Sequence, residues 1–163
     1  MCYAARMELL LLRHGTAEDH GHPLGDAARA LVDKGRGQSR AAGRFLRKID
    51  CLPEVVLASP MVRARQTAEE FCAEAGLGAP VDAPWLACGM APEEALGELR
   101  AYADFGRVMI VGHEPDFSGL VCFLLGAGGG TVRMKKGGVA LLRLRGALRH
   151  GELQFLLPPR AMR

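Results

Sequence analysis

The stretch Glu8-Leu9-Leu10-Leu11-Leu12-Arg13-His14-Gly15-Thr16 decides the fold more than any other part of the chain. A short apolar run that ends in charged residues and a glycine is typical of a strand buried on both faces of a parallel sheet. Residues 55–58 and 108–111 form two further runs of this kind. We therefore predict three buried parallel strands, at residues 8–12, 55–58 and 108–111.

Helix signals follow these strands along the chain. After Ser59-Pro60, which we expect to supply an N-cap and a first-turn proline, small and apolar residues recur with helical spacing from 61 to 75. Asp116 is expected to cap an apolar helix at residues 117–125. The remaining predicted elements are a helix from near Gly35 to Ile49, one from Pro92 towards Tyr102, and two antiparallel strands at 138–144 and 152–157 joined by a turn near Gly146.

Strands that alternate with helices predict an α/β fold, a three-layer sandwich with a mostly parallel central sheet and helices on both faces. In such sheets ligands bind beyond the carboxyl ends of the strands. Arg13 and His14 follow the first predicted strand, Arg63 follows the second, and His113 follows the third. These two arginines and two histidines, with no carboxylate among them, predict a pocket for an anion.

The segment from Gly15 to Lys34 shows no periodicity, so we expect a functional loop that walls or covers this pocket. Its acidic and histidine residues could suggest a metal site, but the His20-x-His22 spacing has no matching pair elsewhere. A solvated, glycine-broken loop is the preferred interpretation of Glu18, Asp19, His20, His22 and Asp26. Arg29 either reaches the pocket or faces solvent, and the sequence leaves both open.

Length and composition limit the possible classes of protein. The 163 residues fit one domain, 1–163 with a core at about 7–157, and Met7 is a possible alternative start to Met1. No segment reaches the roughly 20 apolar residues of a membrane helix, and residues 9–12 are too few for a signal peptide. The five cysteines form no CxxC pair and three lie in apolar surroundings, so we expect reduced thiols and a cytoplasmic location.

The basic residues gather late in the chain. A nucleic-acid surface would need aromatic side chains interleaved with these residues, and none is present. We therefore predict no nucleic-acid or membrane partner, and interpret the excess as a solvated basic face that also attracts anionic substrates. Lys135 and Lys136 could guide substrate, but a charged guard on an edge strand is the preferred interpretation.

Three motifs occur in order: Arg13-His14-Gly15 after the first strand, residues 59–67 (Ser-Pro-x-x-Arg-Ala-x-Gln-Thr), and Gly112-His113-x-Pro115. Together they resemble the histidine phosphatase (phosphoglycerate mutase-like) superfamily, over about residues 8–157. The short length and residues 26–35 are similar to SixA-type phosphohistidine phosphatases. Those proteins usually have Pro and Thr where this chain has Ala30 and Val32.

The resemblance implies a phosphoglycerate mutase-like fold and a phosphatase that acts through a covalent phosphohistidine. His14 would be the nucleophile, Arg13, Arg63 and His113 the phosphate pocket, and Arg29 a further phosphate-binding candidate, without metal or cofactor. The implied substrate is phosphohistidine in a protein, as in signal transduction. The alternatives are a phosphatase of small phosphorylated molecules and a phosphate-binding module without turnover.

A general acid is missing from the expected place. Mutase-like and sugar-phosphatase members commonly have a Glu near what is here residues 85–89, and this chain has no carboxylate there. The absence resembles the SixA-type branch, whose leaving imidazole, with a pKa of about 6.5, needs little protonation. Glu93, Glu94, Glu114 and Asp116 remain possible substitutes, although Glu93 and Asp116 are equally explained as helix-start residues.

Overall fold

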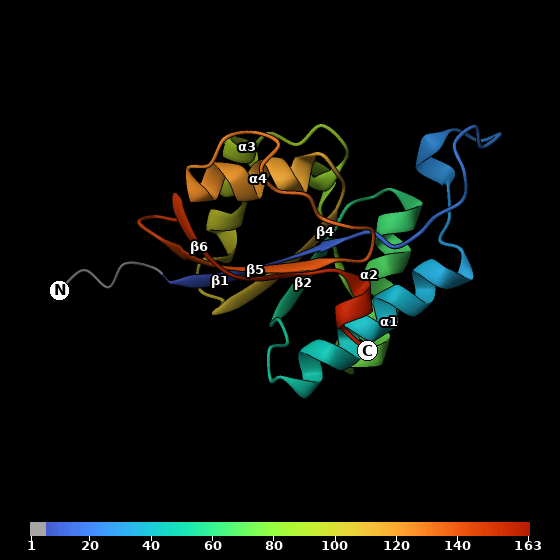
Figure 1. Cartoon of the computed structure of the whole chain (residues 1–163), viewed down its shortest axis with the longest axis horizontal. Helices are drawn as coiled ribbons and strands as arrows, with labels where there is room; N and C mark the ends of the chain where they lie inside the picture. The colour runs from blue at the N-terminus through green and yellow to red at the C-terminus, as the bar shows by residue number, and fades with distance from the viewer. Residues whose placement is uncertain (1–5) are drawn as a thin grey trace.

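A six-stranded mixed sheet forms the centre of the computed structural model, which describes residues 6–163 (Figure 1). Its strands are β1 (Met7–Arg13), β2 (Val55–Ala58), β3 (Val81–Asp82), β4 (Arg107–Gly112), β5 (Val139–Arg145) and β6 (His150–Leu157). Their order is β3-β2-β4-β1-β5-β6. The β3, β2, β4 and β1 strands are parallel, while β5 runs antiparallel to β1 and β6 antiparallel to β5. The predicted mostly parallel α/β sheet is confirmed.

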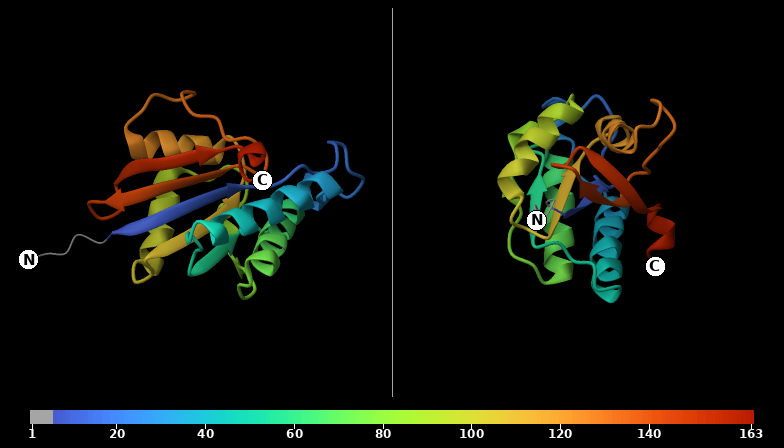
Figure 2. Two further views of the ribbon diagram at one scale, coloured as in Figure 1. Left: turned by 60° about the horizontal axis from the view of Figure 1, so that its bottom comes forward. Right: turned by 90° about the vertical axis from the view of Figure 1, so that its left-hand side faces the viewer.

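Helices cover both faces of this sheet, as Figures 1 and 2 show. The α1 (Asp33–Lys48) and α2 (Val62–Ala75) helices lie on one face, and α3 (Pro92–Leu99) and α4 (Asp116–Leu125) on the other. Four short 3-10 helices occupy Asp26–Ala28, Pro84–Leu86, Arg100–Tyr102 and Pro159–Ala161. The three-layer architecture is therefore the predicted one.

Strand β1 is apolar from Leu9 to Leu12 because it contributes to two cores. Leu9 and Leu11 point into the core under α3 and α4, whereas Leu10 and Leu12 point into the core under α1 and α2. Successive strand residues face opposite sides, so a strand in the middle of a covered sheet has no solvent-facing position. The second core extends beyond residue 157 to Met162, which is buried beside α1 and α2.

Two predicted helix caps are wrong. Ser59 lies before the start of α2, whose N-cap is Met61, and its hydroxyl hydrogen-bonds instead with the His113 imidazole at 2.7 Å. The α4 helix begins at Asp116, and the Glu114 carboxylate accepts the hydrogen bond from the backbone N–H of Ser118. Asp116 accepts from the backbone N–H groups of residues 89 and 90, and so fixes the loop before α3.

The structure also tests the predictions about the cysteines, a membrane-spanning helix and the two lysines near β5. Cys51, Cys72 and Cys122 are buried and Cys88 is exposed, all four as free thiols, while Cys2 lies outside the described residues. Among residues 6–163, no helix has the length and apolar character needed to cross a bilayer. Lys135 and Lys136 lie in the loop before β5 and not on an edge strand, so that interpretation is wrong.

Candidate active site

His14 lies directly after the carboxyl end of β1 and is held there by its own backbone. Its N–H donates to the Gly112 carbonyl at the end of β4, at 3.0 Å. Its carbonyl accepts from the N–H of Gly137, in the loop before β5, also at 3.0 Å. The residue is 6% exposed. The imidazole is therefore anchored where β1, β4 and the β5 loop meet, as the strand-end argument predicted.

The chain turns away from His14 through a close contact between two glycines. A Cβ at Gly15 would lie 2.6 Å from the Gly35 carbonyl oxygen in α1, a distance that no side chain tolerates. The Gly15 N–H donates to the Thr67 hydroxyl in α2 at 3.1 Å. That hydroxyl in turn donates to the Arg63 carbonyl at 2.7 Å. The loop after His14 and the first turn of α2 are thus joined through the Thr67 hydroxyl.

The backbone determines which nitrogen of His14 carries the proton and which carries the free lone pair. Its Nδ1 lies 2.8 Å from the Gly15 carbonyl oxygen. A carbonyl only accepts hydrogen bonds, so in the neutral ring Nδ1 carries the proton. The lone pair is then on Nε2.

Arg63 and His113 approach His14 from the ends of two other elements. Arg63 is in the first turn of α2 and is 3% exposed, and His113 follows β4 and is 2% exposed. The His14 and His113 ring centroids are 5.3 Å apart. Arg13 adjoins His14 in sequence, and one of its guanidinium nitrogens donates to the Met134 carbonyl at 2.8 Å. The structure therefore brings together the four residues that the sequence analysis chose.

Three buried nitrogens in residues 6–163 have no hydrogen-bond partner, and all belong to these residues. They are Arg13 Nε, Arg63 Nε and His113 Nδ1. An unsatisfied buried donor costs about 1–3 kcal/mol, so native proteins keep few of them without a functional reason. A phosphoryl group provides several acceptor oxygens, which matches this set of donors.

Asp26 is the site residue that the sequence analysis missed. Its carboxylate lies 3.0 Å from an Arg63 guanidinium nitrogen and 2.8 Å from Arg29 Nε, and its carbonyl accepts from Arg63 at 2.9 Å. The loop is solvated, as predicted, since Glu18, Asp19, His20 and Asp26 are exposed, but Asp26 also brings to Arg63 a carboxylate that the four chosen residues do not include. The same contacts confirm that this loop walls the pocket.

Arg29 is buried, which excludes the solvent-facing alternative. Its guanidinium donates to Asp26 and to the Glu18 carbonyl, the latter at 2.8 Å. It thus holds Asp26 in place, and a direct contact with phosphate stays a prediction. In the described residues, no three His, Cys, Asp or Glu side chains gather in a group that could hold a metal ion.

Burial keeps both histidines neutral. Loss of hydration lowers the pKa of His14 to about 3; the Gly15 hydrogen bond opposes this effect, and the charges of His113, Arg63 and Arg13 make smaller contributions that lower the pKa. Burial, then the charge of Arg63, lowers the pKa of His113 to about 4. An ordinary histidine has a pKa of about 6.5. At neutral pH the His14 lone pair is therefore available without a separate base.

These lowered pKa values make folding stability pH-dependent. Between pH 6.5 and about 4 the unfolded chain binds protons at residues 14 and 113 that the folded chain does not, so stability falls as pH falls. We expect about 1 kcal/mol of loss for each histidine at pH 5.5 relative to pH 7.5. Urea unfolding at both pH values measures this loss, and His14→Asn should show a smaller one. An equal loss in both proteins would contradict the neutral, buried His14.

Comparisons with known proteins agree with this geometry. The model of the histidine phosphatase superfamily (branch 1) matches residues 9–85. The structure of the protein histidine phosphatase SixA complexed with tungstate superposes with a TM-score of 0.83 at 26% identity, over 96% of this chain and all of that one. This chain belongs to the histidine phosphatase superfamily. It is a phosphatase of SixA-like fold.

A sequence relative and a further solved structure are also similar to this histidine phosphatase. An uncharacterized protein of Picosynechococcus sp. is 35% identical over 144 residues, covering 84% of this chain and 85% of its own length. The alpha-ribazole phosphatase of Shigella flexneri has a TM-score of 0.75 at 19% identity, over 94% of this chain and 97% of its own. At that identity the likeness concerns the fold alone.

Proposed function

We propose that this phosphatase removes the phosphoryl group from phosphohistidine in a protein, through a phosphohistidine formed at His14. The observation that carries the proposal is the set of three unpartnered buried donors, Arg13 Nε, Arg63 Nε and His113 Nδ1, around a histidine whose Nε2 is free to attack. The SixA neighbour, a protein histidine phosphatase, supports the choice of substrate.

The reaction has two steps. In the first, His14 Nε2 attacks phosphorus, the bond from phosphorus to the substrate nitrogen breaks, and its electron pair leaves with the substrate ring. In the second, a water molecule attacks the phosphoryl-His14, the phosphorus–nitrogen bond breaks towards Nε2, and phosphate departs. Arg13, Arg63 and His113 donate to the phosphoryl oxygens, where charge resides throughout. Dividing the hydrolysis in two replaces one difficult displacement by two easier ones.

No carboxyl group near the pocket is placed as a proton donor. The hydrogen bond from Arg29, with the charges of Arg63 and Arg29, lowers the pKa of Asp26, so its carboxyl group is ionised at neutral pH. Glu114 accepts from the backbone N–H and hydroxyl of Ser118, and Asp116 from the loop before α3. A phosphohistidine ring that already carries a proton on its other nitrogen leaves as neutral imidazole when the phosphorus–nitrogen bond breaks, so it needs no proton donor and suits such a site.

Asp26 also affects how phosphate enters. Its carboxylate occupies part of the Arg63 guanidinium, and its side chain is 48% exposed whereas that of Arg63 is 4% exposed. An incoming phosphoryl group competes for the same guanidinium, and two anions there repel each other. We propose that the loop at Asp26–Ala28 shifts outward when substrate binds, with Arg29 keeping the carboxylate paired.

Two alternatives remain to be separated by experiment. The alpha-ribazole phosphatase neighbour favours a small phosphorylated molecule as the substrate, but only at the level of the fold. A binding module without turnover would not need His14, because cations alone bind phosphate. We place the protein in the cytoplasm, where its four described cysteines would remain free thiols.

A panel of phosphorylated substrates tests the proposed function. We expect phosphate release from a histidine-phosphorylated protein, undiminished by EDTA, and much slower release from sugar phosphates and nucleotides. The measurement is initial phosphate release at equal substrate concentration, with and without chelator. Preferred hydrolysis of a sugar phosphate would move the substrate to small molecules, and loss of activity in EDTA that a divalent ion restores would contradict the metal-free pocket.

A further inference from the structure

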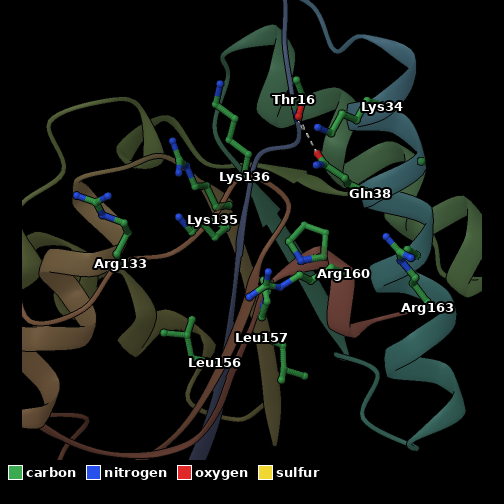
Figure 3. A pocket seen from close by; sticks show the side chains of 15 residues that line it. Thr16, Lys34, Gln38, Arg133, Lys135, Lys136, Leu156, Leu157, Arg160 and Arg163 are labelled. Carbon is green, nitrogen blue, oxygen red and sulfur yellow. Dashed lines mark hydrogen bonds between the residues drawn. The ribbon is translucent and has the colours of Figure 1, made fainter.

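A second cavity lies beside the phosphate pocket. It has a volume of about 1040 Å³ and is bordered by the end of β1, the start of α1, the loop before β5 and the C-terminal residues (Figure 3). Arg13 lines it and also adjoins His14, so the two sites share one arginine. The reaction mechanism uses none of the other residues of this basic cleft, as we call the cavity.

The lining of the basic cleft is highly charged. Seven of the 21 Lys and Arg residues of the chain line it, whereas none of the 18 Asp and Glu residues does. Figure 3 shows Arg133, Lys135 and Lys136 on one side and Lys34 and Arg163 across from them. Within residues 6–163, none of the seven forms an ion pair with a carboxylate.

Most of the basic residues outside the cleft form ion pairs; among residues 6–163 the exceptions there are Arg6, Arg47, Lys48, Arg100 and Arg149. On the outer surface of α1, Arg36 and Arg40 both pair with Glu70 of α2, each at 2.7 Å. What distinguishes the cleft is that seven unpaired basic residues gather in one place, where the like charges repel one another until an anion enters. A ligand with several negative charges gains from all of them at once, while a single phosphate does not.

The uncharged part of the lining indicates what kind of polyanion fits. Its floor is formed by the half-buried Leu156, Leu157, Pro158 and Pro159. The residues that line the cleft include no Phe, Tyr or Trp on which a nucleobase could stack. A polypeptide in which acidic and aliphatic residues are interspersed would match both the basic rim and the apolar floor. Inorganic polyphosphate or nucleic acid would make no apolar contact with that floor.

We propose that the basic cleft binds an acidic polypeptide segment of the phosphorylated protein substrate. The proposal rests on the proposed function, because it assumes that the phosphoryl group is attached to a protein. Arg13 sets the geometry: the phosphorylated side chain enters beside His14 while its flanking chain crosses the cleft towards Arg160. The cleft then selects among phosphoproteins by charge, without taking part in the chemistry.

Charge reversal tests the proposal by kinetics. Lys135→Glu/Arg160→Glu changes opposite sides of the cleft, and Arg100→Glu/Arg149→Glu is the matched control, at exposed positions outside it. The substrates are a phosphohistidine peptide with four flanking glutamates, its glutamine counterpart, and free phosphohistidine. We expect the cleft variant to raise KM at least tenfold for the glutamate peptide and less than threefold for the other two substrates. Equal effects on all three substrates, or an equal effect of the control, would overturn the proposal.

Binding without turnover separates this proposal from the proposed function. The unphosphorylated glutamate peptide should bind the wild-type protein, and this binding should weaken as salt is added. The cleft variant should bind the peptide at least tenfold more weakly. If this binding is seen but phosphohistidine is not hydrolysed, the proposed function fails and the cleft stands. Tighter binding of polyphosphate or an oligonucleotide with the same number of charges would overturn the acidic segment as the occupant.

Discussion

His14→Ala is expected to reduce phosphate release by at least about 1000-fold with every substrate, while the protein stays folded. The change removes the atom to which the phosphoryl group is transferred, and no other histidine has an unpaired Nε2 beside Arg13 and Arg63. His113 cannot replace it, because its Nε2 is 2.7 Å from the Ser59 hydroxyl. Steady-state phosphate release, with circular dichroism to confirm folding, provides the measurement.

His150→Ala is the matched control, since His150 is exposed at the start of β6, far along the chain from the pocket. It should keep full activity. Quenching with alkaline detergent during turnover of a labelled substrate should trap an alkali-stable, acid-labile phosphoryl group on the wild-type and His150→Ala proteins, and none on His14→Ala. A folded His14→Ala protein with ordinary turnover would refute the covalent mechanism.

The sheet and the four central site residues were predictable from the sequence because both depend on local signals. The leucines of β1 are apolar without interruption, and a strand of that kind occurs only inside a covered parallel sheet. Once β1, β2 and β4 are parallel neighbours, their carboxyl ends must meet at one edge. His14, Arg63 and His113 then have to come together, whatever the loops between them do.

The role of Asp26 was not predictable in this way. It lies in a loop without periodicity, held by side chains that are distant in sequence: Gln66 of α2 accepts the Leu31 N–H at 2.8 Å, and Arg29 donates to Glu18. Such contacts depend on the final packing of α1 against α2. The sequence did contain a signal for this role. Asp26 lies three positions before Arg29, in a loop next to the predicted anion pocket, and is therefore a potential partner for the arginines of that pocket.

The two wrong helix caps have a related cause. Ser59 is suited to capping by residue type, but its hydroxyl is 2.7 Å from Nε2 of the buried His113 imidazole, where an unpaired nitrogen would be costly. Only the distance between β2 and β4 in the folded sheet reveals that competition. Sequence analysis therefore identified the residue and assigned it the wrong partner.

The leaving group should dominate substrate choice. Without a proton donor at residues 85–89, the electron pair of the breaking bond must be accepted by the leaving group itself. Each pKa unit of leaving-group basicity costs up to about 1.4 kcal/mol, a tenfold loss of rate. Imidazole has a pKa of about 6.5 and a tyrosine-like phenol about 10, and a serine alkoxide is more basic still.

We therefore expect kcat/KM to fall steeply from phosphohistidine to aryl phosphates, and to be at least about 1000-fold lower for phosphoserine and sugar phosphates than for phosphohistidine. For a series of aryl phosphates measured at one pH, a plot of log kcat/KM against the pKa of the leaving phenol should be a line of negative slope. The nucleophile and the pocket are constant in this series, and only the leaving group varies. A flat line would reveal a general acid. Asp26→Asn, Glu93→Gln, Glu94→Gln and Glu114→Gln would then identify it, since only the variant that lacks the donor would restore the steep slope. In the absence of such a donor, all four variants retain the slope of the wild-type protein, and the pocket hydrolyses only those phosphoryl bonds whose leaving group departs unaided.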